Sequence, residues 1–329
     1  MFLIIGDPHF TASNIPEIDI FIGGLQKLIR RCKPDICIML GDLLHEHERL
    51  HTTALNKAYD FIKLLSTFSE VYCLVGNHDF INNRQFLTKH HWMNGMKEWD
   101  RVTVVDYPRY VVKNGVKMSL VPYVPPGNFV QALDFLTDWK QSDVIFAHQE
   151  IRGCKMGAII SEEGDEWKEE YPLVVSGHIH SHQWIGKNVY YPGACMQHAF
   201  GESEKNIIAT ISNTLEINEY DLGLPRKRIV YMKIEDMKTY SLPDTKDKLK
   251  LTISGNQQEF KSFKKTKKYK ELMKNGAKIV YKYKKDDETE RQIKEHGDEH
   301  FMHILHQLVK NNNTQYLEND YKNLLKNNL

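Results

Sequence analysis

Short apolar runs alternate with longer amphipathic stretches over the first 180 residues of the chain. Each run is aliphatic or β-branched and is followed at once by glycine or polar residues, as is typical of buried strands. Strands that alternate with helical patterns indicate an α/β layered fold. The predicted core strands are Phe2–Ile5, Asp35–Leu40, Val71–Val75, Val144–Ala147 and Leu173–Ser176.

The stretches between these runs predict helices and hairpins. Helical patterns begin near Pro16, which suits a first turn, and near Thr53 and Asn128, which suit caps. The Asn114-Gly115 pair indicates a two-residue hairpin turn. The expected helices end at Cys32, Phe68 and Trp139; the expected hairpins are Arg109–Val121 and the pair Ile207–Ile211 and Leu215–Tyr220 around Ser212-Asn213-Thr214.

A domain boundary is predicted within Asp221–Arg228, which contains Gly223 and Pro225. The predicted domains are residues 1–222, a small α+β domain over 223–299, and C-terminal amphipathic helices over 300–329. In the small domain we expect strands Lys248–Ser254 and Ala277–Tyr283 and a helix Gln257–Lys274; the C-terminal apolar stripes are Phe301–Val309 and Leu317–Leu325.

Composition narrows the class of protein. With 41% hydrophobic and 26% charged residues the chain is typical of globular proteins. No run approaches the roughly 18 apolar residues of a membrane helix, and the opening segment lacks the basic start of a signal peptide, so we expect neither. Five cysteines without a Cys-x-x-Cys pair favour an intracellular, reducing compartment, cytoplasm or nucleus.

Charge is divided unevenly along the chain. The formal net charge is only +1, but residues 225–329 carry 24 Lys and Arg against 15 Asp and Glu, which leaves 20 against 28 before residue 225. The two parts are therefore expected to have separate roles, one of which could face a polyanion.

Each predicted strand ends at a group that can bind a metal ion, and ligand sites of open α/β sheets lie beyond the carboxyl ends of strands. A single histidine or aspartate in such a place is more often a cap or a solvated residue. Because five strands all end at such residues, a shared metal site is the better interpretation. Gly41, Gly76 and Gly177 precede candidates where the chain must turn sharply. The candidate ligands are Asp7, His9, Asp42, Asn77, His148, His178 and His180.

The ligand types select a class of metal. Carboxylate, imidazole and one amide without sulfur suit a first-row divalent ion such as Mn²⁺, Fe²⁺ or Zn²⁺ rather than Ca²⁺. Seven candidates exceed the needs of one ion. They fit two ions about 3.5–4 Å apart that share a carboxylate, an arrangement that activates water and holds a phosphoryl group during in-line displacement.

In order, these motifs resemble those of the calcineurin-like metallophosphoesterases over residues 7 to 180. Gly41-Asp42-Leu43-Leu44-His45-Glu46 and Ala147-His148-Gln149 look most like the SbcD-type DNA double-strand-break-repair nucleases, the catalytic partners of an SMC-like ATPase. Tyr191-Pro192-Gly193-Ala194 also resembles that group, whereas Met196–Phe200 departs from it. The matching motifs are Asp7-Pro8-His9, Gly41-Asp42, Gly76-Asn77-His78-Asp79, His148 and Gly177-His178-Ile179-His180.

The resemblance implies a fold and a ligand set. The fold is an α/β metallophosphoesterase-type β-sandwich core flanked by helices. Two divalent ions are implied, Mn²⁺ first, with Fe²⁺, Zn²⁺ or Mg²⁺ as alternatives. Asp42 would bridge them; one ion would be held by Asp7, His9, Asp42 and His180, the other by Asp42, Asn77, His148 and His178.

Three further residues receive catalytic roles from the same resemblance. His78 would donate a proton to the leaving oxygen or stabilise the phosphate, and Asp79 would orient that imidazole. A helix cap is the alternative for Asp79. His45 matches a histidine that contacts the scissile phosphate, with a solvated loop residue as its alternative.

The segment Lys261–Lys285 holds 11 lysines against one acidic residue, Glu271, with aromatic residues between them. It could follow a phosphate backbone and stack on bases, with Lys264, Lys265, Lys267 and Lys268 as DNA contacts. It could equally be a solvated face whose aromatic residues fill the small domain's own core.

The sequence therefore predicts a metal-dependent DNA nuclease in repair, recombination or replication. Expected partners are DNA, an SbcC-type SMC-like ATPase and a second copy of the chain. The alternatives are a phosphatase or small-nucleotide phosphodiesterase of the same superfamily, or a DNA-binding scaffold subunit. The C-terminal stripes could bind the ATPase or the chain's own core. His198 lies in a predicted rim loop and could contact substrate, although an exposed loop histidine is the commoner case; the helical face from His296 to His306 could bind metal, although a solvated face is the commoner case.

Overall fold

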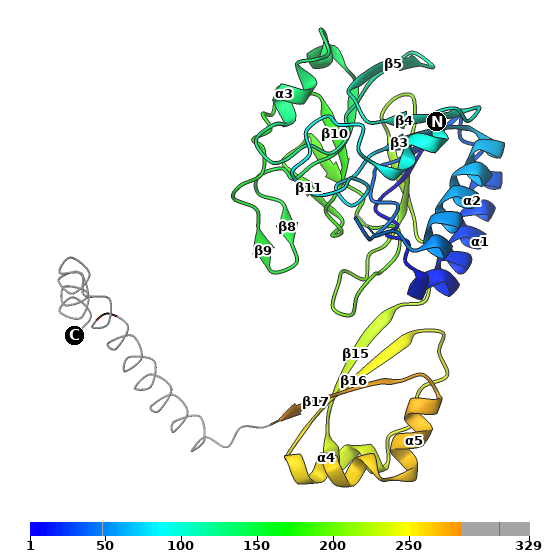
Figure 1. Cartoon of the computed structure of the whole chain (residues 1–329), viewed down its shortest axis with the longest axis vertical. Coiled ribbons are helices and arrows are strands. Elements are labelled where there is room, and N and C mark those ends of the chain that lie inside the picture. The colour runs from blue at the N-terminus through cyan, green and yellow to red at the C-terminus, as the bar shows by residue number, and fades with distance from the viewer. Residues whose placement is uncertain (48, 284–308, 310–329) are drawn as a thin grey trace. The chain divides into compact units, whose positions relative to one another are not determined.

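The computed structural model describes residues 1–47, 49–283 and 309. The described chain forms two compact units (Figure 1). The first contains residues 1–229 and 244–249, and the second contains residues 230–243 and the described residues from 250 onward. The sequence predicted a single domain boundary near residue 222. In the structure the chain passes into the second unit after Ile229 and returns to the first unit for Asp244–Leu249. The predicted C-terminal helices lie outside the described residues, apart from Val309.

The first unit is a sandwich of two six-stranded mixed sheets, which confirms the predicted fold class. The first sheet has the order β14-β13-β1-β2-β3-β4: β14 (Ile217–Tyr220), β13 (Ile208–Ile211), β1 (Phe2–Ile5), β2 (Ile36–Met39), β3 (Glu70–Leu74) and β4 (Val102–Val105). The second has the order β11-β12-β10-β7-β6-β5: β11 (Gln183–Ile185), β12 (Val189–Tyr191), β10 (Leu173–Gly177), β7 (Val144–His148), β6 (Val116–Leu120) and β5 (Arg109–Lys113). A short hairpin, β8 (Lys155–Met156) and β9 (Ile159–Ile160), lies beside them.

The inner strands β1 and β2 of the first sheet are apolar throughout because both of their faces are covered. Along β1, Phe2 and Ile4 belong to the core between the two sheets, while Leu3 and Ile5 belong to the core beneath the helices. That outer layer consists of α1 (Ile15–Cys32) and α2 (Thr52–Phe68), which lie side by side in Figure 1. The continuous apolar runs were therefore correctly interpreted as buried strands.

Two helix predictions need correction at their ends. The cap of α2 is His51, whose ring accepts from the backbone N–H of Thr53 at 3.2 Å. The expected helix to Trp139 stops after one turn: α3 is Phe129–Leu133, followed by the 3₁₀ turn η3 (Trp139–Gln141). Asp134 accepts from Trp139 Nε1 at 3.0 Å, a local contact that competes with continued helix. The other 3₁₀ turns are η1 (Ala12–Asn14), η2 (Trp92–Met96) and η4 (Ile234–Lys238).

The second unit contains most of a three-stranded sheet, in the order β15-β16-β17, and two helices. The strands are β15 (Lys227–Lys233), β16 (Lys248–Gly255) and β17 (Lys278–Tyr283). One long helix was predicted, but there are two, α4 (Gln257–Lys264) and α5 (Lys267–Lys274). Thr266 divides them, because its hydroxyl donates to the carbonyl of Phe263 at 2.7 Å and accepts from the N–H of Tyr269 at 3.2 Å.

Two aromatic residues of this lysine-rich unit lie in its core. Phe260 and Phe263 are buried, and the ring centroids of Phe260 and Tyr281 are 4.2 Å apart. The buried rings are therefore not platforms for bases. Among the described helices of the whole chain, none is both long and apolar enough to cross a membrane.

Candidate metal centre

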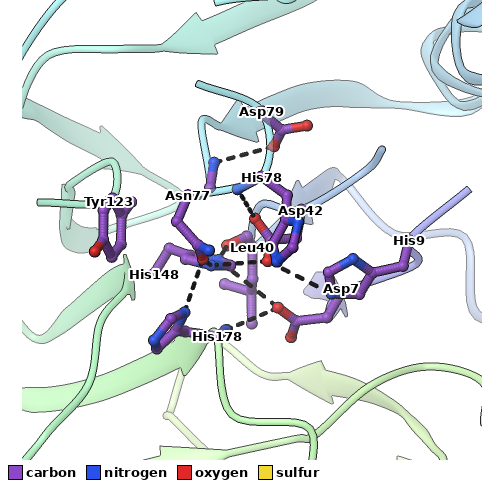
Figure 2. A network of polar contacts seen from close by, with 12 residues as sticks. Asp7, His9, Leu40, Asp42, Asn77, His78, Asp79, Tyr123, His148 and His178 are labelled. Carbon is purple, nitrogen blue, oxygen red and sulfur yellow. Dashed lines mark hydrogen bonds and ion pairs between the residues drawn. The ribbon is translucent and has the colours of Figure 1, made fainter. Parts of the chain in front are cut away.

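Strands from both sheets deliver the predicted ligands to one place. Five strands end at the same edge of the sandwich: β1, β2 and β3 of the first sheet, and β7 and β10 of the second. The side chains that follow these strands point toward one another (Figure 2). Donor atoms within 4.8 Å of one another form three groups: Asp7, His9 and His180; Asp42, His148 and His178; and His9, His45 and His78.

One group surrounds the side-chain oxygen of Asn77. Asn77 Oδ1 lies 2.9 Å from His148 Nε2 and 2.8 Å from His178 Nδ1. His148 Nε2 also lies 3.4 Å from Asp42 Oδ2. Because His148 Nδ1 bonds to the carbonyl of Leu40 at 2.7 Å, and a carbonyl only accepts, the neutral ring presents the lone pair of Nε2 to the cluster. With a neutral His148 ring, the lone pairs of Nε2 and Asn77 Oδ1 face one another, and either a proton or a bound cation would satisfy them.

The second group lies beside the first. His9 Nε2 and His180 Nε2 are 3.0 Å apart. Asp7 is fully buried; its Oδ1 accepts from the N–H of His178 at 2.8 Å, whereas Oδ2 has no hydrogen-bond partner among the described residues. A buried carboxylate oxygen without a partner, next to two convergent imidazoles, fits the oxygen and nitrogen ligands of a divalent ion.

Asp42 lies between the two groups. Its Oδ2 is 3.5 Å from His9 Nε2 and 3.4 Å from His148 Nε2, and its Oδ1 accepts from the N–H of His78 at 2.8 Å. This is the position that a carboxylate shared by two ions would occupy. The structure thus brings all seven predicted ligands together, in two groups that fit divalent cations.

The charged groups of the cluster shift one another's pKa values. Burial alone would lower the pKa of His148, but the carboxylates of Asp42 and Asp7 outweigh it and raise the pKa to about 9. Burial and the charge of His148 lower the pKa of His178 to about 3. Without a metal ion, a proton on His148 therefore balances part of the acidic charge, and a bound divalent cation would replace it.

The backbone at the site is unusual. Asp7, His9, Asp42 and His178 have φ values of 41°, 45°, 52° and 79°, in the left-handed region that non-glycine residues seldom adopt. Such conformations persist only where the surroundings impose them, and they often mark functional sites.

Glycine has a different role here from the one expected. Of Gly41, Gly76 and Gly177, which precede the candidate ligands, only Gly41 has a positive φ, 110°. A Cβ on Gly76 would lie 2.2 Å from Asp42 Oδ1, and one on Gly177 would lie 2.8 Å from the carbonyl oxygen of Leu40. Gly76 and Gly177 are thus needed for close approach of the ligand loops rather than for a turn.

His78 and His45 lie next to the ligands. The rings of His78 and His45 stack, with centroids 5.2 Å apart, and the centroid of His78 is 4.9 Å from that of His9. His78 Nδ1 lies 2.6 Å from the carbonyl oxygen of His45, so the proton on Nδ1 is fixed and Nε2 is left for other contacts. His45 Nδ1 is 3.2 Å from His9 Nδ1.

The predicted role of Asp79 requires correction. The described hydrogen bonds of its carboxylate run not to His78 but to the N–H of Gly76 at 3.0 Å, the N–H of Leu44 at 3.3 Å and Trp92 Nε1 at 2.8 Å. Burial and the charge of Asp42 raise the pKa of Asp79 to about 7. Asp79 therefore fixes the loops around the site, and a backbone carbonyl orients His78.

Sequence reasoning did not predict that the segment that follows the last motif contacts the ligands. His198 lies against the ligands, with its ring centroid 5.0 Å from that of His9. Burial tends to raise the pKa of Glu202, but contacts with His180 and two backbone N–H groups lower it to about 2. An open pocket of about 540 Å³ runs past these residues; its lining includes His9, His45, His180, His198, Glu202, Lys227 and Lys248. Two signals in the sequence pointed to this segment: His198 lies in a predicted rim loop, and Met196–Phe200 departs from the family pattern.

Fold and site together define a metal-dependent phosphoesterase. The chain belongs to the calcineurin-like phosphoesterase family, whose model matches residues 1–195. It is 49% identical to "Putative phosphoesterase 244L" of Invertebrate iridescent virus 6 over 276 residues, which are 80% of this chain and 97% of that protein. It is 43% identical to "Putative phosphoesterase 078R" of Invertebrate iridescent virus 3 over 333 aligned residues, which cover 98% and 96% of the two chains.

A solved structure described as a novel archaeal phosphodiesterase is similar over 67% of this chain and 98% of its own length. The two share 14% sequence identity, and the TM-score is 0.37.

Proposed function

We propose that this phosphoesterase cleaves phosphodiester bonds in DNA and uses two Mn²⁺ ions. The observation that carries this proposal is the open pocket of about 540 Å³ beside the ligands, which extends past the metal positions. Its lining includes Lys227 and Lys248 beside Glu17, Glu46 and Glu202, and Lys248 pairs with Glu17. A phosphodiester within a polymer brings further phosphates on either side of the bond that is cleaved. Cationic side chains beyond the metal ligands suit those phosphates.

The ions, when bound, would supply an activated water and neutralise charge on the phosphoryl oxygens. Asp42 would hold both positions at a fixed separation, from its place between His9 and His148. His78 would act on the leaving oxygen: the carbonyl of His45 holds the proton on Nδ1, so the proton to be donated would be the second one, which Nε2 carries only when the ring is the imidazolium ion. His45, exposed at the rim, would contact the phosphate.

The lysine-rich second unit supports DNA as the substrate. Lys265 and Lys267 are exposed. Lys264 lies over the ring of Tyr281, with Nζ 5.1 Å from the centroid, and Lys268 pairs with Glu271 at 3.3 Å. Exposed lysines at the junction of α4 and α5 would contact phosphates without reading sequence.

A phosphatase or a small-nucleotide phosphodiesterase is the second candidate. The burial of Phe260 and Phe263 favours it, because these rings cannot stack on the bases of a DNA strand. The names of the viral relatives go no further than phosphoesterase.

One comparison of substrates decides between these functions. Purified protein with Mn²⁺ is offered linear and circular DNA, single- and double-stranded, together with bis(p-nitrophenyl) phosphate and p-nitrophenyl phosphate. The proposal expects cleavage of DNA and of the diester, loss of both on addition of EDTA, and slow hydrolysis of the monoester. Rapid hydrolysis of the monoester with intact DNA would establish a phosphatase; cleavage of the small diester alone would establish the small-nucleotide enzyme.

An SMC-like ATPase and a second copy of the chain remain proposed partners within an intracellular compartment. Support comes from the resemblance of Gly41–Glu46 and Ala147–Gln149 to the SbcD-type nucleases. Deletion of residues 300–329 tests the ATPase: the shortened chain should keep its phosphoesterase activity and lose co-purification with the ATPase. Loss of thermal stability without loss of the partner would contradict this.

A further inference from the structure

We infer that Glu202 is a positioning residue for one of the two metal positions, the one formed by Asp7, His9 and His180. Its carboxylate would fix the orientation and the tautomer of His180. The inference rests on the metal site alone and holds for any phosphoester substrate. Glu202 lies outside the five motifs of the family.

Glu202 faces the side of His180 that is turned away from the other ligands. Its Oε1 is 3.5 Å from His180 Nδ1, while His180 Nε2 lies 3.0 Å from His9 Nε2. An ionised carboxylate can only accept, so it keeps the ring proton on Nδ1 and leaves the lone pair of Nε2 for a metal ion. Carboxylates in this relation to a ligand histidine also raise its basicity.

The carboxylate is itself held in place. Glu202 Oε2 accepts from the N–H of His198 at 2.7 Å and from the N–H of Ala199 at 2.8 Å. Lys227 Nζ donates to the carbonyls of Gln197 at 2.8 Å and His198 at 2.6 Å. Gln197 Nε2 also donates to the carbonyl of Glu202 at 3.2 Å, so segment 197–202 is held at both ends and Glu202 has little freedom to leave His180.

The same segment reaches the other two ligands of this position. His198 Nε2 donates to the carbonyl oxygen of Asp7 at 2.8 Å, and its ring packs against His9. Asp7 and His9 both have left-handed backbone conformations, which need such external contacts. Segment 197–202 thus supports all three ligands of one position.

The other position has its own support. The carbonyl of Leu40 fixes the ring of His148. Both residues are fully buried. Loss of the Glu202 carboxylate should therefore lower the metal affinity of one position and leave that of the other unchanged. If Glu202 only stabilised the fold, its loss would affect both positions.

Calorimetric titration of the metal-free full chain with Mn²⁺ tests this. Glu202→Gln keeps the size of the side chain and an oxygen for the two N–H groups, but it presents an amide to His180. We expect one position with wild-type affinity and one weakened roughly 10–100-fold. The thermal midpoint of the metal-free protein should stay at the wild-type value. Glu204→Gln is the matched control, since Glu204 is exposed and lies two residues beyond Glu202 in the chain, and it should bind both ions normally.

Wild-type affinity at both positions would overturn the inference. Equal weakening of both positions, or a lower midpoint with unchanged affinities, would also overturn it and would leave Glu202 a purely structural role. If Glu202→Gln does not fold, Glu202→Asp decides by the same titration, because it keeps the charge but withdraws it from His180 by one methylene group. Normal affinity at both positions in that variant would again contradict the inference.

Discussion

His148 Nδ1 donates to the carbonyl oxygen of Leu40 across 2.7 Å. His148 ends β7 in one sheet and Leu40 follows β2 in the other, so this hydrogen bond joins the two layers of the sandwich at the metal site. Because it also sets which nitrogen of His148 faces Asn77 and Asp42, the chemistry of the site depends on how the two sheets are packed.

Replacement of Asp42 should remove both metal positions together. Its Oδ2 lies between His9 and His148, so Asp42→Ala takes a ligand from each group at once. We expect metal content, measured by elemental analysis, and phosphoesterase activity to be lost in parallel. Asp60→Ala, an exposed site on α2, is the control and should behave as wild type. More than about a tenth of the wild-type rate at saturating metal would argue against a shared carboxylate.

Replacement of His78 should separate metal binding from turnover. The ring contacts the ligand His9 through its edge and the carbonyl of His45 through Nδ1, but it lies outside the two ligand groups assigned to the ions. His78→Ala should keep its metal while the rate falls roughly 10²–10³-fold, because proton donation and charge stabilisation are lost. Exposed His90→Ala serves as the control. Loss of the ions along with activity would place His78 among the ligands.

A methyl group on Gly76 should disrupt the site. The added Cβ would lie 2.2 Å from Asp42 Oδ1 and 2.3 Å from Asp42 N, atoms of a residue that cannot retreat without leaving both metal positions. Gly76→Ala should therefore lose metal affinity and activity. Gly23→Ala, where nothing lies within 4 Å of the added atom on helix α1, should retain both and gain a little stability. Normal metal binding by Gly76→Ala would mean that the ligand loops adapt.

Reversal of charge in the second unit tests its contact with DNA. We expect weaker DNA binding with a smaller salt dependence when four lysines are changed together to Glu: Lys264, Lys265, Lys267 and Lys268. The reason is that each phosphate contact contributes about 0.9 to the slope of log K against log salt. Hydrolysis of a small diester should be unchanged. The same change at exposed Lys63, Lys89, Lys117 and Lys187 of the first unit is the control. Identical slopes for the two variants would assign the lysines of α4 and α5 to a solvated face.

Asp106 should stabilise the first unit in a pH-dependent way. Burial tends to raise its pKa, but hydrogen bonds from His91 at 3.2 Å and Lys97 at 2.6 Å outweigh burial and hold the pKa well below its usual value. The contribution is therefore present above the unfolded pKa of about 3.9 and is lost as pH falls through the folded value. Asp106→Asn should cost about 1–2 kcal/mol at pH 7.

Thermal unfolding at pH 7 and pH 3 measures this effect. The difference between wild type and Asp106→Asn should shrink at pH 3, whereas Asp100→Asn, at an exposed site, should match wild type at both values. If the difference in thermal midpoint between wild type and Asp106→Asn is the same at both pH values, the ionised carboxylate is not the source of the stabilisation.

The sequence by itself determined the layers of the fold and the metal ligands. A strand buried on both faces must be apolar along its whole length, as Phe2–Ile5 is, so such strands can be read from the sequence. The ligands follow strand ends because parallel neighbours in one sheet place those ends at one edge. Local pattern and motif order sufficed for both.

Only the tertiary structure decided which groups support the ligands. The partner of His78 is the carbonyl of His45, and a backbone carbonyl leaves no trace in the sequence. The contact between Glu202 and His180 joins segments that follow no common periodic pattern. Helix α4 ends at Lys264 and a new helix begins after Thr266, whose hydroxyl bonds to backbone partners on both sides; the apolar spacing of Gln257–Lys274 does not encode these bonds. Periodicity records which face of an element is buried, but the partner of each polar atom depends on packing between elements distant in the sequence.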